Sequence, residues 1–247
     1  MKPILLIPAR LAATRLPAKP LADIGGVPMI VRVMRQAMAA ELGPVVVAAG
    51  EKEIVTVVEA AGGKAVLTDP ALPSGSDRVQ AALEAFDPGA RHDVVVNLQG
   101  DLPALDPGQI RKVVAALEES GADIATLAAE ITEPGERDNP HVVKAVVAWR
   151  PDGQLGRALY FTRATAPSGD GPLFHHVGLY SYRRAALSRF VRLSPSPLEE
   201  REKLEQLRAL EANMSIAVAR VDSVPLSVDT PADLAKAIQF FARKSPS

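Results

Sequence analysis

The fold of this chain is decided by residues 94–101, which read Val94-Val95-Val96-Asn97-Leu98-Gln99-Gly100-Asp101. Three consecutive β-branched residues favour a strand that is buried on both faces. Asp101 follows this strand, at the carboxyl end where open parallel sheets bind ligands. Its carboxylate is therefore a candidate ligand for a hard ion such as Mg²⁺. An aspartate in that position also commonly caps a turn, and the stretch alone leaves both interpretations open.

Strand-like and helix-like segments alternate around this stretch. Short aliphatic runs predict strands at residues 4–7, 45–48 and 65–67. Apolar residues spaced three and four apart predict helices at residues 30–38, 54–61, 76–86 and 110–117. Strands that are apolar on both faces and alternate with helices are typical of parallel sheets covered by helices. The sequence therefore predicts an α/β fold with a doubly wound, mostly parallel, Rossmann-like sheet.

The second half of the chain has fewer helical segments. Strand-like runs lie at residues 124–129, 142–149, 174–182 and 216–221. We expect them to form a smaller extension in which some strands are antiparallel. The remaining predicted elements are a helix carrying Leu204, Leu207 and Leu210 and a terminal helix from Pro231 to Phe241. Because no long linker divides the chain, we predict a single domain over residues 1–247, with parts at about 1–120, 121–228 and 229–247.

The composition argues against several classes of protein. Of the 247 residues, 47% are hydrophobic and 23% are charged, and the formal net charge of -1 gives no attraction to nucleic acid or an anionic membrane. The chain has no cysteine, which excludes disulfides and thiolate metal sites. No run reaches the roughly 18 apolar residues of a membrane-spanning helix. The apolar start is broken by proline and followed by arginines, unlike a signal peptide, so we expect a cytoplasmic protein without membrane or nucleic-acid partners.

A cationic loop follows the first predicted strand. Residues 8–19 carry Arg10, Arg15 and Lys19 on a backbone stiffened by prolines. Guanidinium forks bind phosphate oxygens bidentately, and a lysine adds a mobile positive charge, so the loop is a candidate polyphosphate site. A solvated surface loop is the alternative. The sequence has neither a G-x-x-x-x-G-K-[ST] nor a G-x-G-x-x-G motif, which argues against a P-loop NTPase and a dinucleotide site.

Two predicted helical segments carry residues whose role could be either structural or functional. Asp229 is a second candidate metal ligand, but it precedes Thr230-Pro231, a pair that also starts a helix well. Glu205 and Gln206 lie on the leucine-bearing helix, where acidic and amide side chains usually form the solvated face. Residues 199–210 could form an interface helix, although so narrow an apolar stripe more often packs internally.

The strand at residues 174–182 predicts a pocket wall. Side chains alternate between the faces of a strand, so one face carries His176, Gly178, Tyr180 and Tyr182. A polar face beside an apolar one is typical of a half-buried strand that lines a pocket. A zinc site is a poor interpretation, because adjacent histidines on a strand diverge. A serine nucleophile is also disfavoured, since no G-x-S-x-G motif occurs.

Several segments, taken in order, carry a resemblance. They are Pro8-Ala9-Arg10, Thr14-Arg15-Leu16-Pro17, Lys19-Pro20-Leu21, Ser74-Gly75-Ser76-Asp77-Arg78, Gln99-Gly100-Asp101, Asn139 to Lys144, Ala158 to Ala164, Ser196 to Glu199, Leu204 to Arg208, and Val228 to Pro231. In this order they resemble the sugar-acid cytidylyltransferases, and most closely the 3-deoxy-manno-octulosonate (KDO) cytidylyltransferase family. The resemblance spans nearly the whole chain.

The resemblance implies a reaction and a site. The implied reaction is transfer of CMP from CTP to the anomeric hydroxyl of KDO, for lipopolysaccharide synthesis, by a homodimer that uses Mg²⁺. The residues implied to hold CTP are Pro8, Ala9, Arg10, Lys19, Ser74, Arg78 and Gln99. Those that would act on the phosphates or the metal are Arg10, Arg15, Lys19, Asp101 and Asp229. Those that would surround the sugar acid are Gln99, Arg163, His176, Tyr180, Glu205 and Gln206.

The chain departs from the family pattern in places, and rival functions stay open. Leu102 stands where the family usually has glutamate, and Gly50 where it usually has aspartate. The loop after Pro167 is short and lacks the family's tryptophan. The alternatives are a cytidylyltransferase for 8-amino-KDO or sialic acid, a glycosyltransferase, and a CTP-binding protein without activity. A glycosyltransferase would need an Asp-x-Asp motif after the strand at 94–96, and none occurs there.

Overall fold

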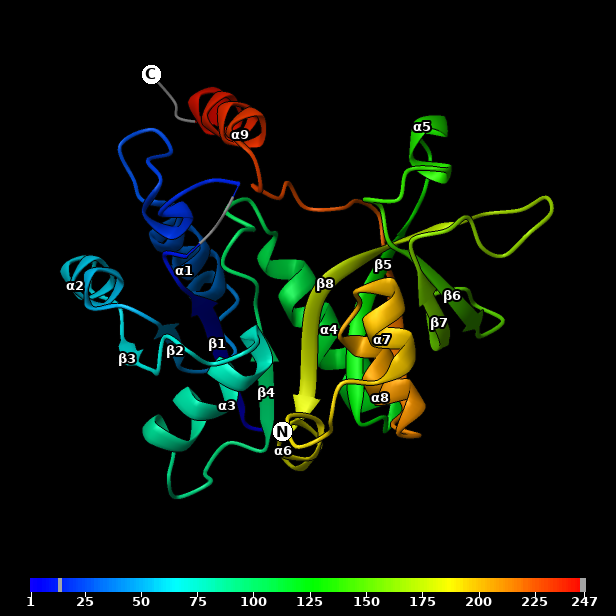
Figure 1. Cartoon of the computed structure of the whole chain (residues 1–247), viewed down its shortest axis with the longest axis horizontal. Coiled ribbons are helices and arrows are strands. Elements are labelled where there is room, and N and C mark those ends of the chain that lie inside the picture. Colours follow the sequence, from blue (N-terminus) through cyan, green and yellow to red (C-terminus); the bar gives the residue numbers. More distant parts are fainter. Residues whose placement is uncertain (13–14, 245–247) are drawn as a thin grey trace. The chain divides into compact units, whose positions relative to one another are not determined.

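A computed structural model describes residues 1–12 and 15–244 of the chain. Thr14 of the opening motif and the predicted frayed tail, Ser245-Pro246-Ser247, lie outside the described residues. Contacts divide the chain into two compact units. The first unit comprises residues 2–110 and the chain from Pro225 onward, and the second comprises Met1 and residues 111–224. Figure 1 labels the helices and strands.

The first unit contains a parallel sheet with the spatial order β3-β2-β1-β4. Its strands are β1 (Pro3–Ala9), β2 (Val45–Ala49), β3 (Ala65–Leu67) and β4 (Val94–Asn97). Its helices are α1 (Met29–Ala39), α2 (Lys52–Ala60), α3 (Gly75–Phe86) and α9 (Pro231–Lys244), with a short 3-10 turn, η1 (Lys19–Leu21). The predicted strand–helix alternation of this half is confirmed.

Right-handed crossovers determine which face each helix of the first unit covers. The chain moves from β1 to β2 to β3 in one direction and returns past β1 to form β4. Right-handed connections therefore place α1 and α2 on one face of the sheet and α3 on the other. Figure 1 shows α1 and α2 near each other and α3 apart from them.

The core of the first unit lies along its central strands. Ile4, Leu5, Leu6 and Ile7 on β1 are completely buried, as are the neighbouring valines of β4. Burial of each such side chain contributes about 1.5–3 kcal/mol relative to exposure. A second cluster joins Ile24, Met29, Val228 and Ala237, and so fixes α9 to this unit although its sequence is distant.

The second unit contains five strands in the spatial order β8-β5-β9-β7-β6. They are β5 (Ile124–Glu130), β6 (Lys144–Trp149), β7 (Leu155–Thr162), β8 (Phe174–Arg183) and β9 (Ile216–Val221). Only the β5–β9 pair among these described strands is parallel, and β6 also pairs with β8 at Lys144 and His175. The predicted fold, a mostly parallel sheet with a smaller antiparallel extension, is confirmed.

Helices of the second half differ from the prediction. The helices are α4 (Pro107–Ser120), which starts in the first unit, and α5 (Pro134–Arg137), α6 (Arg184–Phe190), α7 (Pro197–Glu202) and α8 (Gln206–Glu211). The prediction of a single helix through residues 199–210 was wrong. Lys203 adopts the left-handed conformation, with φ of 56°, and ends α7 before α8 begins. Strand β7 and helices α5 and α6 were not predicted.

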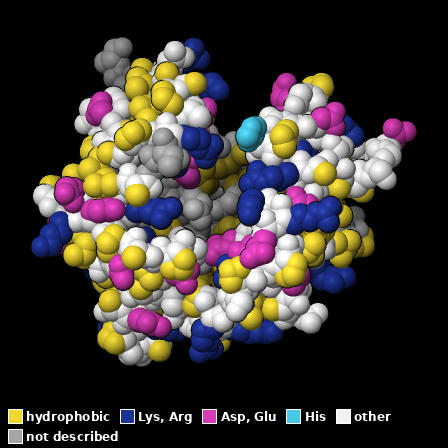
Figure 2. Space-filling model, viewed as in Figure 1, with side chains coloured by type: hydrophobic (Ala, Val, Ile, Leu, Met, Phe, Trp, Pro, Cys, Tyr) yellow, Lys and Arg dark blue, Asp and Glu magenta, His cyan; other side chains and the backbone are white. Residues whose placement is uncertain are grey.

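The surface agrees with the near-zero net charge. Over the face in Figure 2, basic and acidic side chains are intermixed. Across the described residues, each helix is too short or too polar to cross a bilayer.

Candidate active site

The strand order of the first unit reverses at β1. Strands β2 and β3 lie on one side of β1, and β4 lies on the other. In open α/β sheets, the carboxyl ends of strands at such a reversal form the ligand-binding crevice. Strand β1 leads into the cationic loop, and β4 leads into Gln99-Gly100-Asp101. The two loops predicted to bind phosphate and metal therefore begin at neighbouring strand ends.

Close backbone contacts fix both loops. A Cβ atom on Gly100 would lie 2.9 Å from the carbonyl oxygen of Pro8, so only glycine fits there without a backbone shift. The Leu11 backbone N–H donates a 2.9 Å hydrogen bond to Oε2 of Glu51, which anchors the start of the cationic loop. Glu51 was not predicted as a site residue, and its only sequence signal is its position directly after a strand end.

Lys19 joins the two carboxylates predicted to bind metal. Its Nζ donates to Oδ2 of Asp101 at 2.9 Å and to Oδ1 of Asp229 at 3.0 Å. Arg15 Nη2 lies 3.3 Å from the same oxygen of Asp229. The Val228 backbone N–H also donates to the Asp101 carbonyl oxygen at 2.9 Å, which brings the segment before α9 to the end of β4. Sequence spacing could not show this convergence.

Asp229 is placed by the start of α9. Oδ2 of Asp233 accepts hydrogen bonds from the Thr230 backbone N–H at 3.1 Å and from its Oγ1 at 2.8 Å. In return, the Asp233 backbone N–H donates to Thr230 Oγ1 at 3.2 Å. These reciprocal bonds satisfy the orphan groups of the first turn. Both interpretations of this segment hold: it starts a helix, and it carries Asp229 to the site.

The carboxylate pair is suited to a divalent cation. Burial by itself would lower the pKa of Lys19, but the charges of Asp101 and Asp229 outweigh burial and raise it. A cation is thus favoured between these two carboxylates. Among the described residues, no cluster of three or more metal-binding side chains occurs. Mg²⁺ typically takes one or two carboxylates and completes its shell with substrate phosphates and water, so the pair fits Mg²⁺ with a nucleotide bound.

Two cavities lie along these loops. The larger has a volume of about 320 Å³, and the predicted residues that line it are Pro8, Ala9, Arg10, Arg15, Lys19, Gln99, Asp101 and Asp229. The smaller has a volume of about 140 Å³, and the predicted residues that line it are Pro8, Ala9, Arg10, Ser74, Arg78 and Gln99. Every residue predicted to hold nucleotide or metal therefore lines one of two cavities that share walls.

Ser74 and Arg78 are held by contacts within the protein. Ser74 caps α3, and its Oγ accepts a 3.2 Å hydrogen bond from the Asp77 backbone N–H. The buried guanidinium of Arg78 donates to Thr68 Oγ1 at 2.6 Å and to the Asp69 carbonyl oxygen at 3.0 Å. Burial lowers the pKa of Arg78. Both side chains therefore shape the wall of the smaller cavity.

Two of the three departures from the family pattern, Gly50 and Leu102, have structural counterparts. A Cβ atom on Gly50 would lie 3.1 Å from Arg78 Nη1 and 3.3 Å from Arg10 Cβ, so glycine allows these arginines to approach each other. Leu102 is 6% exposed and belongs to the core, so it packs where the family pattern offers a carboxylate. Asp101 and Asp229 remain the two candidate metal ligands.

The second unit carries five of the six residues predicted to surround the sugar acid, and the sixth, Gln99, belongs to the first unit. A row of aromatic rings runs along it, with His176 4.8 Å from Phe161 and 5.5 Å from Tyr180, and Tyr180 5.9 Å from Tyr182. The prediction that His176, Tyr180 and Tyr182 share a face of the strand is confirmed. Burial, followed by the charges of Tyr182 and then Glu205, raises the pKa of Tyr180 well above its usual value, which places Glu205 near this row.

Arg163 fixes the corner between α7 and α8. Its Nε donates to the Glu202 carbonyl oxygen at 2.8 Å, and its Nη1 donates to the Pro140 carbonyl oxygen at 3.0 Å. The Glu202 carboxylate accepts from the Arg163 backbone N–H at 2.9 Å and from Thr162 Oγ1 at 2.7 Å. The buried Gln206 begins α8 just beyond this corner. Glu202 was missed, because nothing in the acidic run 199–202 singles it out.

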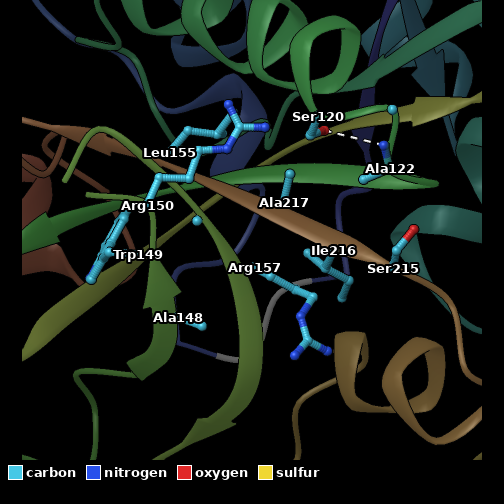
Figure 3. Close-up of a pocket in the computed structure, with 12 residues that line it drawn as sticks. Ser120, Ala122, Ala148, Trp149, Arg150, Leu155, Arg157, Ser215, Ile216 and Ala217 are labelled. Atoms are coloured by element: carbon cyan, nitrogen blue, oxygen red, sulfur yellow. Dashed lines mark hydrogen bonds between the residues drawn. The ribbon is translucent and has the colours of Figure 1, made fainter. Parts of the chain in front are cut away.

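A further cavity of the second unit contains no residue predicted for the site. Its volume is about 300 Å³, and Figure 3 shows Trp149, Leu155, Arg157 and Ile216 among its lining residues. Its walls come from the ends of β6, β7 and β9 and from the turn after α4.

Comparisons with known proteins agree with the resemblance found in the sequence. Residues 4–216 match the model of a family described as cytidylyltransferase. A 3-deoxy-manno-octulosonate cytidylyltransferase of Parvibaculum lavamentivorans is 66% identical over 98% of this chain and 94% of its own length. A protein of the same description from Rhodospirillum centenum is 64% identical over 95% of this chain and 91% of its own. A solved structure of CMP:2-keto-3-deoxy-manno-octonic acid synthetase complexed with CTP is 34% identical, with a TM-score of 0.91 over 99% of this chain and 100% of that one.

Proposed function

The chain belongs to the cytidylyltransferase family, and from this premise we propose that it transfers CMP from CTP to KDO and releases pyrophosphate. The similarity to enzymes of that activity supports the choice of substrates. The geometric observation that carries the proposal is the convergence of Asp101 and Asp229 on Lys19, in a cavity that Arg10 and Arg15 also line. Such a site combines fixed positive charge with a place for a divalent ion.

The reaction requires the protein to align the two substrates and to supply positive charge. The anomeric hydroxyl oxygen of KDO forms a bond to the α-phosphorus of CTP, the bond from that phosphorus to the bridging oxygen breaks, and the hydroxyl proton is lost. Phosphoryl transfer of this kind needs no covalent nucleophile, because alignment and electrostatic stabilisation supply most of the catalysis. Arg10, Arg15 and Lys19 would hold the phosphates.

The metal would occupy the carboxylate pair. Asp101 and Asp229 are the proposed ligands, and Mg²⁺ is the proposed ion. When bound, the ion would neutralise charge on the phosphate oxygens and help pyrophosphate to leave. Lys19 pairs with both carboxylates, so binding of the ion would require this lysine to release at least one of them.

Each substrate is assigned to a set of residues, and Gln99 belongs to both sets. The nucleotide would lie along the two cavities of the first unit, against the backbone of Pro8 and Ala9 and the wall made by Ser74 and Arg78. The sugar acid would meet Arg163, His176, Tyr180, Glu205 and Gln206, together with Gln99. His176 and Tyr180 are neutral at pH 7, because burial lowers the pKa of His176 and raises the pKa of Tyr180, and neutral side chains suit hydrogen bonding to hydroxyl groups.

The proposal also covers the oligomeric state, the cellular compartment and the use of the product. The family resemblance supports a homodimer, a cytoplasmic reaction and a product used for lipopolysaccharide synthesis. Light scattering during gel filtration tests the dimer, which predicts a mass of twice 26.1 kDa. A mass of one chain at working concentration would contradict this part of the proposal and leave the reaction untouched.

Pyrophosphate release tests the reaction. Purified protein receives CTP, KDO and Mg²⁺, with UTP, sialic acid, 8-amino-KDO and EDTA as comparison arms. Release with CTP and KDO alone, abolished by EDTA, is the expected result. Release with another acid would retain the reaction class and change the sugar. CTP binding without release from any acid would contradict the proposal and favour a non-catalytic CTP-binding protein.

A further inference from the structure

The hydroxyl of Thr126 lies at the centre of three polar contacts inside the second unit. Thr126 is completely buried on β5. Its Oγ1 lies 2.9 Å from His176 Nε2, 3.0 Å from the Val177 carbonyl oxygen and 2.9 Å from the Leu179 carbonyl oxygen. No sequence motif pointed to this residue, which is the one polar side chain in the run Ile124 to Ala129.

An irregularity in the sheet explains the contacts. Along the β5–β8 ladder, Leu127 pairs with Val177 and Ala125 pairs with Ser181. Thr126 alone therefore faces the intervening segment 178–180 of β8, which bulges opposite it. The carbonyl oxygens of Val177, just before this bulge, and of Leu179, within it, accept hydrogen bonds from the Thr126 hydroxyl.

The number of donors and acceptors around Thr126 Oγ1 then indicates which ring nitrogen of His176 carries a hydrogen. A threonine hydroxyl has one hydrogen to donate and two lone pairs that accept. The two carbonyl oxygens can only accept, so they share the single hydroxyl hydrogen in a three-centre bond. The lone pairs of Oγ1 are then left for His176 Nε2, which must carry a hydrogen to bond them. A bare Nε2 would put three acceptors around one hydrogen, which is costly in a buried site.

The ring has only one hydrogen to place at neutral pH. Burial, and then the charge of His175, lower the pKa of His176 to about 3. The imidazole is therefore neutral, and a neutral imidazole carries its hydrogen on one nitrogen only. With that hydrogen on Nε2, Nδ1 has a free lone pair. The rings of Phe161 and Tyr180 flank the imidazole and restrict its rotation.

We propose that Thr126 is a positioning residue that holds His176 as the Nε2–H tautomer, so that Nδ1 accepts a hydrogen bond from a hydroxyl group of the sugar acid. The inference rests on the proposed function, in which His176 meets the sugar. It adds which group His176 recognises: a bare nitrogen accepts from a hydroxyl and does not bind the substrate carboxylate. Thr126 acts through His176 and does not itself contact substrate.

Nitrogen NMR tests the tautomer without requiring turnover. Long-range ¹H–¹⁵N spectra distinguish a protonated ring nitrogen from a bare one, and the chain has 4 histidines to resolve. The signal that disappears in His176→Gln is assigned to His176. In the wild-type protein at pH 7 we expect Nε2 protonated and Nδ1 bare. Thr126→Ser keeps the hydroxyl and should keep this pattern, whereas Thr126→Val removes the acceptor and should move hydrogen to Nδ1.

Kinetics provide the second readout. Thr126→Val should raise KM for KDO about tenfold, as expected for loss of one hydrogen bond, with KM for CTP unchanged. Thr126→Ser should stay within about twofold of wild type. A purely structural role would lower the amount of folded enzyme without separating the two KM values.

Three results would overturn the inference. They are a wild-type His176 protonated at Nδ1, a Thr126→Val variant that keeps the Nε2–H pattern, and equal changes in both KM values. If Thr126→Val does not fold, the spectra of the wild type and Thr126→Ser still decide. Failure of the proposed function looks different, because wild-type protein would then release no pyrophosphate from CTP and KDO whatever its tautomer.

Discussion

The two units carry predicted binding residues of opposite physical character. In the first unit, partly exposed charges on loops converge from sequence positions as far apart as 210 residues, and Lys19 bridges two carboxylates. In the second unit, buried aromatic and imidazole rings stand along one strand, and His176 is neutral. The difference separates two tasks. Phosphates and a metal need net charge that water can reach, whereas a sugar hydroxyl needs neutral groups held in one orientation.

The largest effect is expected at the two proposed metal ligands. Asp101→Ala should lower kcat about a hundred- to thousandfold, because one electrostatic partner of the developing charge is lost. The side chain is partly exposed, so the fold should persist. Steady-state pyrophosphate release measures the change, and the exposed Asp222→Ala is the matched control. Near-normal turnover of Asp101→Ala would remove Asp101 from the metal site.

Replacing Lys19 should distinguish two effects of its ammonium group, one on the phosphates of the nucleotide and one on the carboxylates of Asp101 and Asp229. Lys19→Gln removes the ammonium between Asp101 and Asp229, so these carboxylates should attract a divalent ion more strongly. The Mg²⁺ concentration for half-maximal activity should fall. At the same time, kcat should fall roughly a hundredfold, because a fixed charge on the phosphates is gone.

The Mg²⁺ dependence of pyrophosphate release measures both quantities for Lys19→Gln. The exposed Lys52→Gln serves as the control. A weaker Mg²⁺ response in Lys19→Gln would mean that the lysine helps to hold the ion instead of competing with it.

A smaller effect is expected where the two loops of the first unit touch. Gly100→Ala would place a Cβ atom 2.9 Å from the Pro8 carbonyl oxygen, and the backbone would have to shift. Overpacking of this kind lowers the free energy of unfolding by about 1–3 kcal/mol. Denaturant unfolding measures the change. Gly135→Ala is the control, because its added Cβ would meet no atom within 4 Å, and equal stability of the two variants would refute the close approach.

The neutral His176 ring of the second unit should make the free energy of unfolding depend on pH. Because the pKa of His176 falls to about 3 in the folded chain, the unfolded chain binds this proton more readily below its ordinary pKa near 6.5. Stability should therefore decline as pH falls from about 6.5, by up to about 1.4 kcal/mol per pH unit from this group.

Unfolding of His176→Gln at pH 7.0 and 5.5, values chosen on either side of that pKa, measures the contribution of His176. The variant should lack this part of the decline, and the exposed His141→Gln should retain it. Parallel losses of stability in wild type and His176→Gln would contradict the buried neutral ring.

The two regions also differ in what the sequence could reveal. Strands β1, β2 and β4 were predictable because their aliphatic runs are buried on both faces, and β3 was predictable from its aliphatic run although it is only partly buried. The loops after β1 and β4 were predictable as binding segments. The meeting of Asp229 with Asp101 was not, because it depends on a hydrogen bond from Val228 and on the packing of α9. Local patterns do not encode such long-range contacts.

The second unit was less visible in the sequence. Gly156 and Arg157 interrupt the apolar pattern of β7, so that strand was missed. A left-handed Lys203 breaks the expected helix, although lysine rarely adopts that conformation. Thr126 left one signal, a lone hydroxyl in an apolar run, but its significance depends on a bulge in the partner strand.

The division of labour between the two units is tested most directly on one variant, His176→Gln, by calorimetric titration with CTP and Mg²⁺ beside its KM for KDO. We expect wild-type affinity for CTP and a KM for KDO raised about tenfold or more. Loss of CTP affinity to the same degree, or an unchanged KM for KDO, would contradict the claim that the second unit recognises the sugar acid while the first holds the nucleotide.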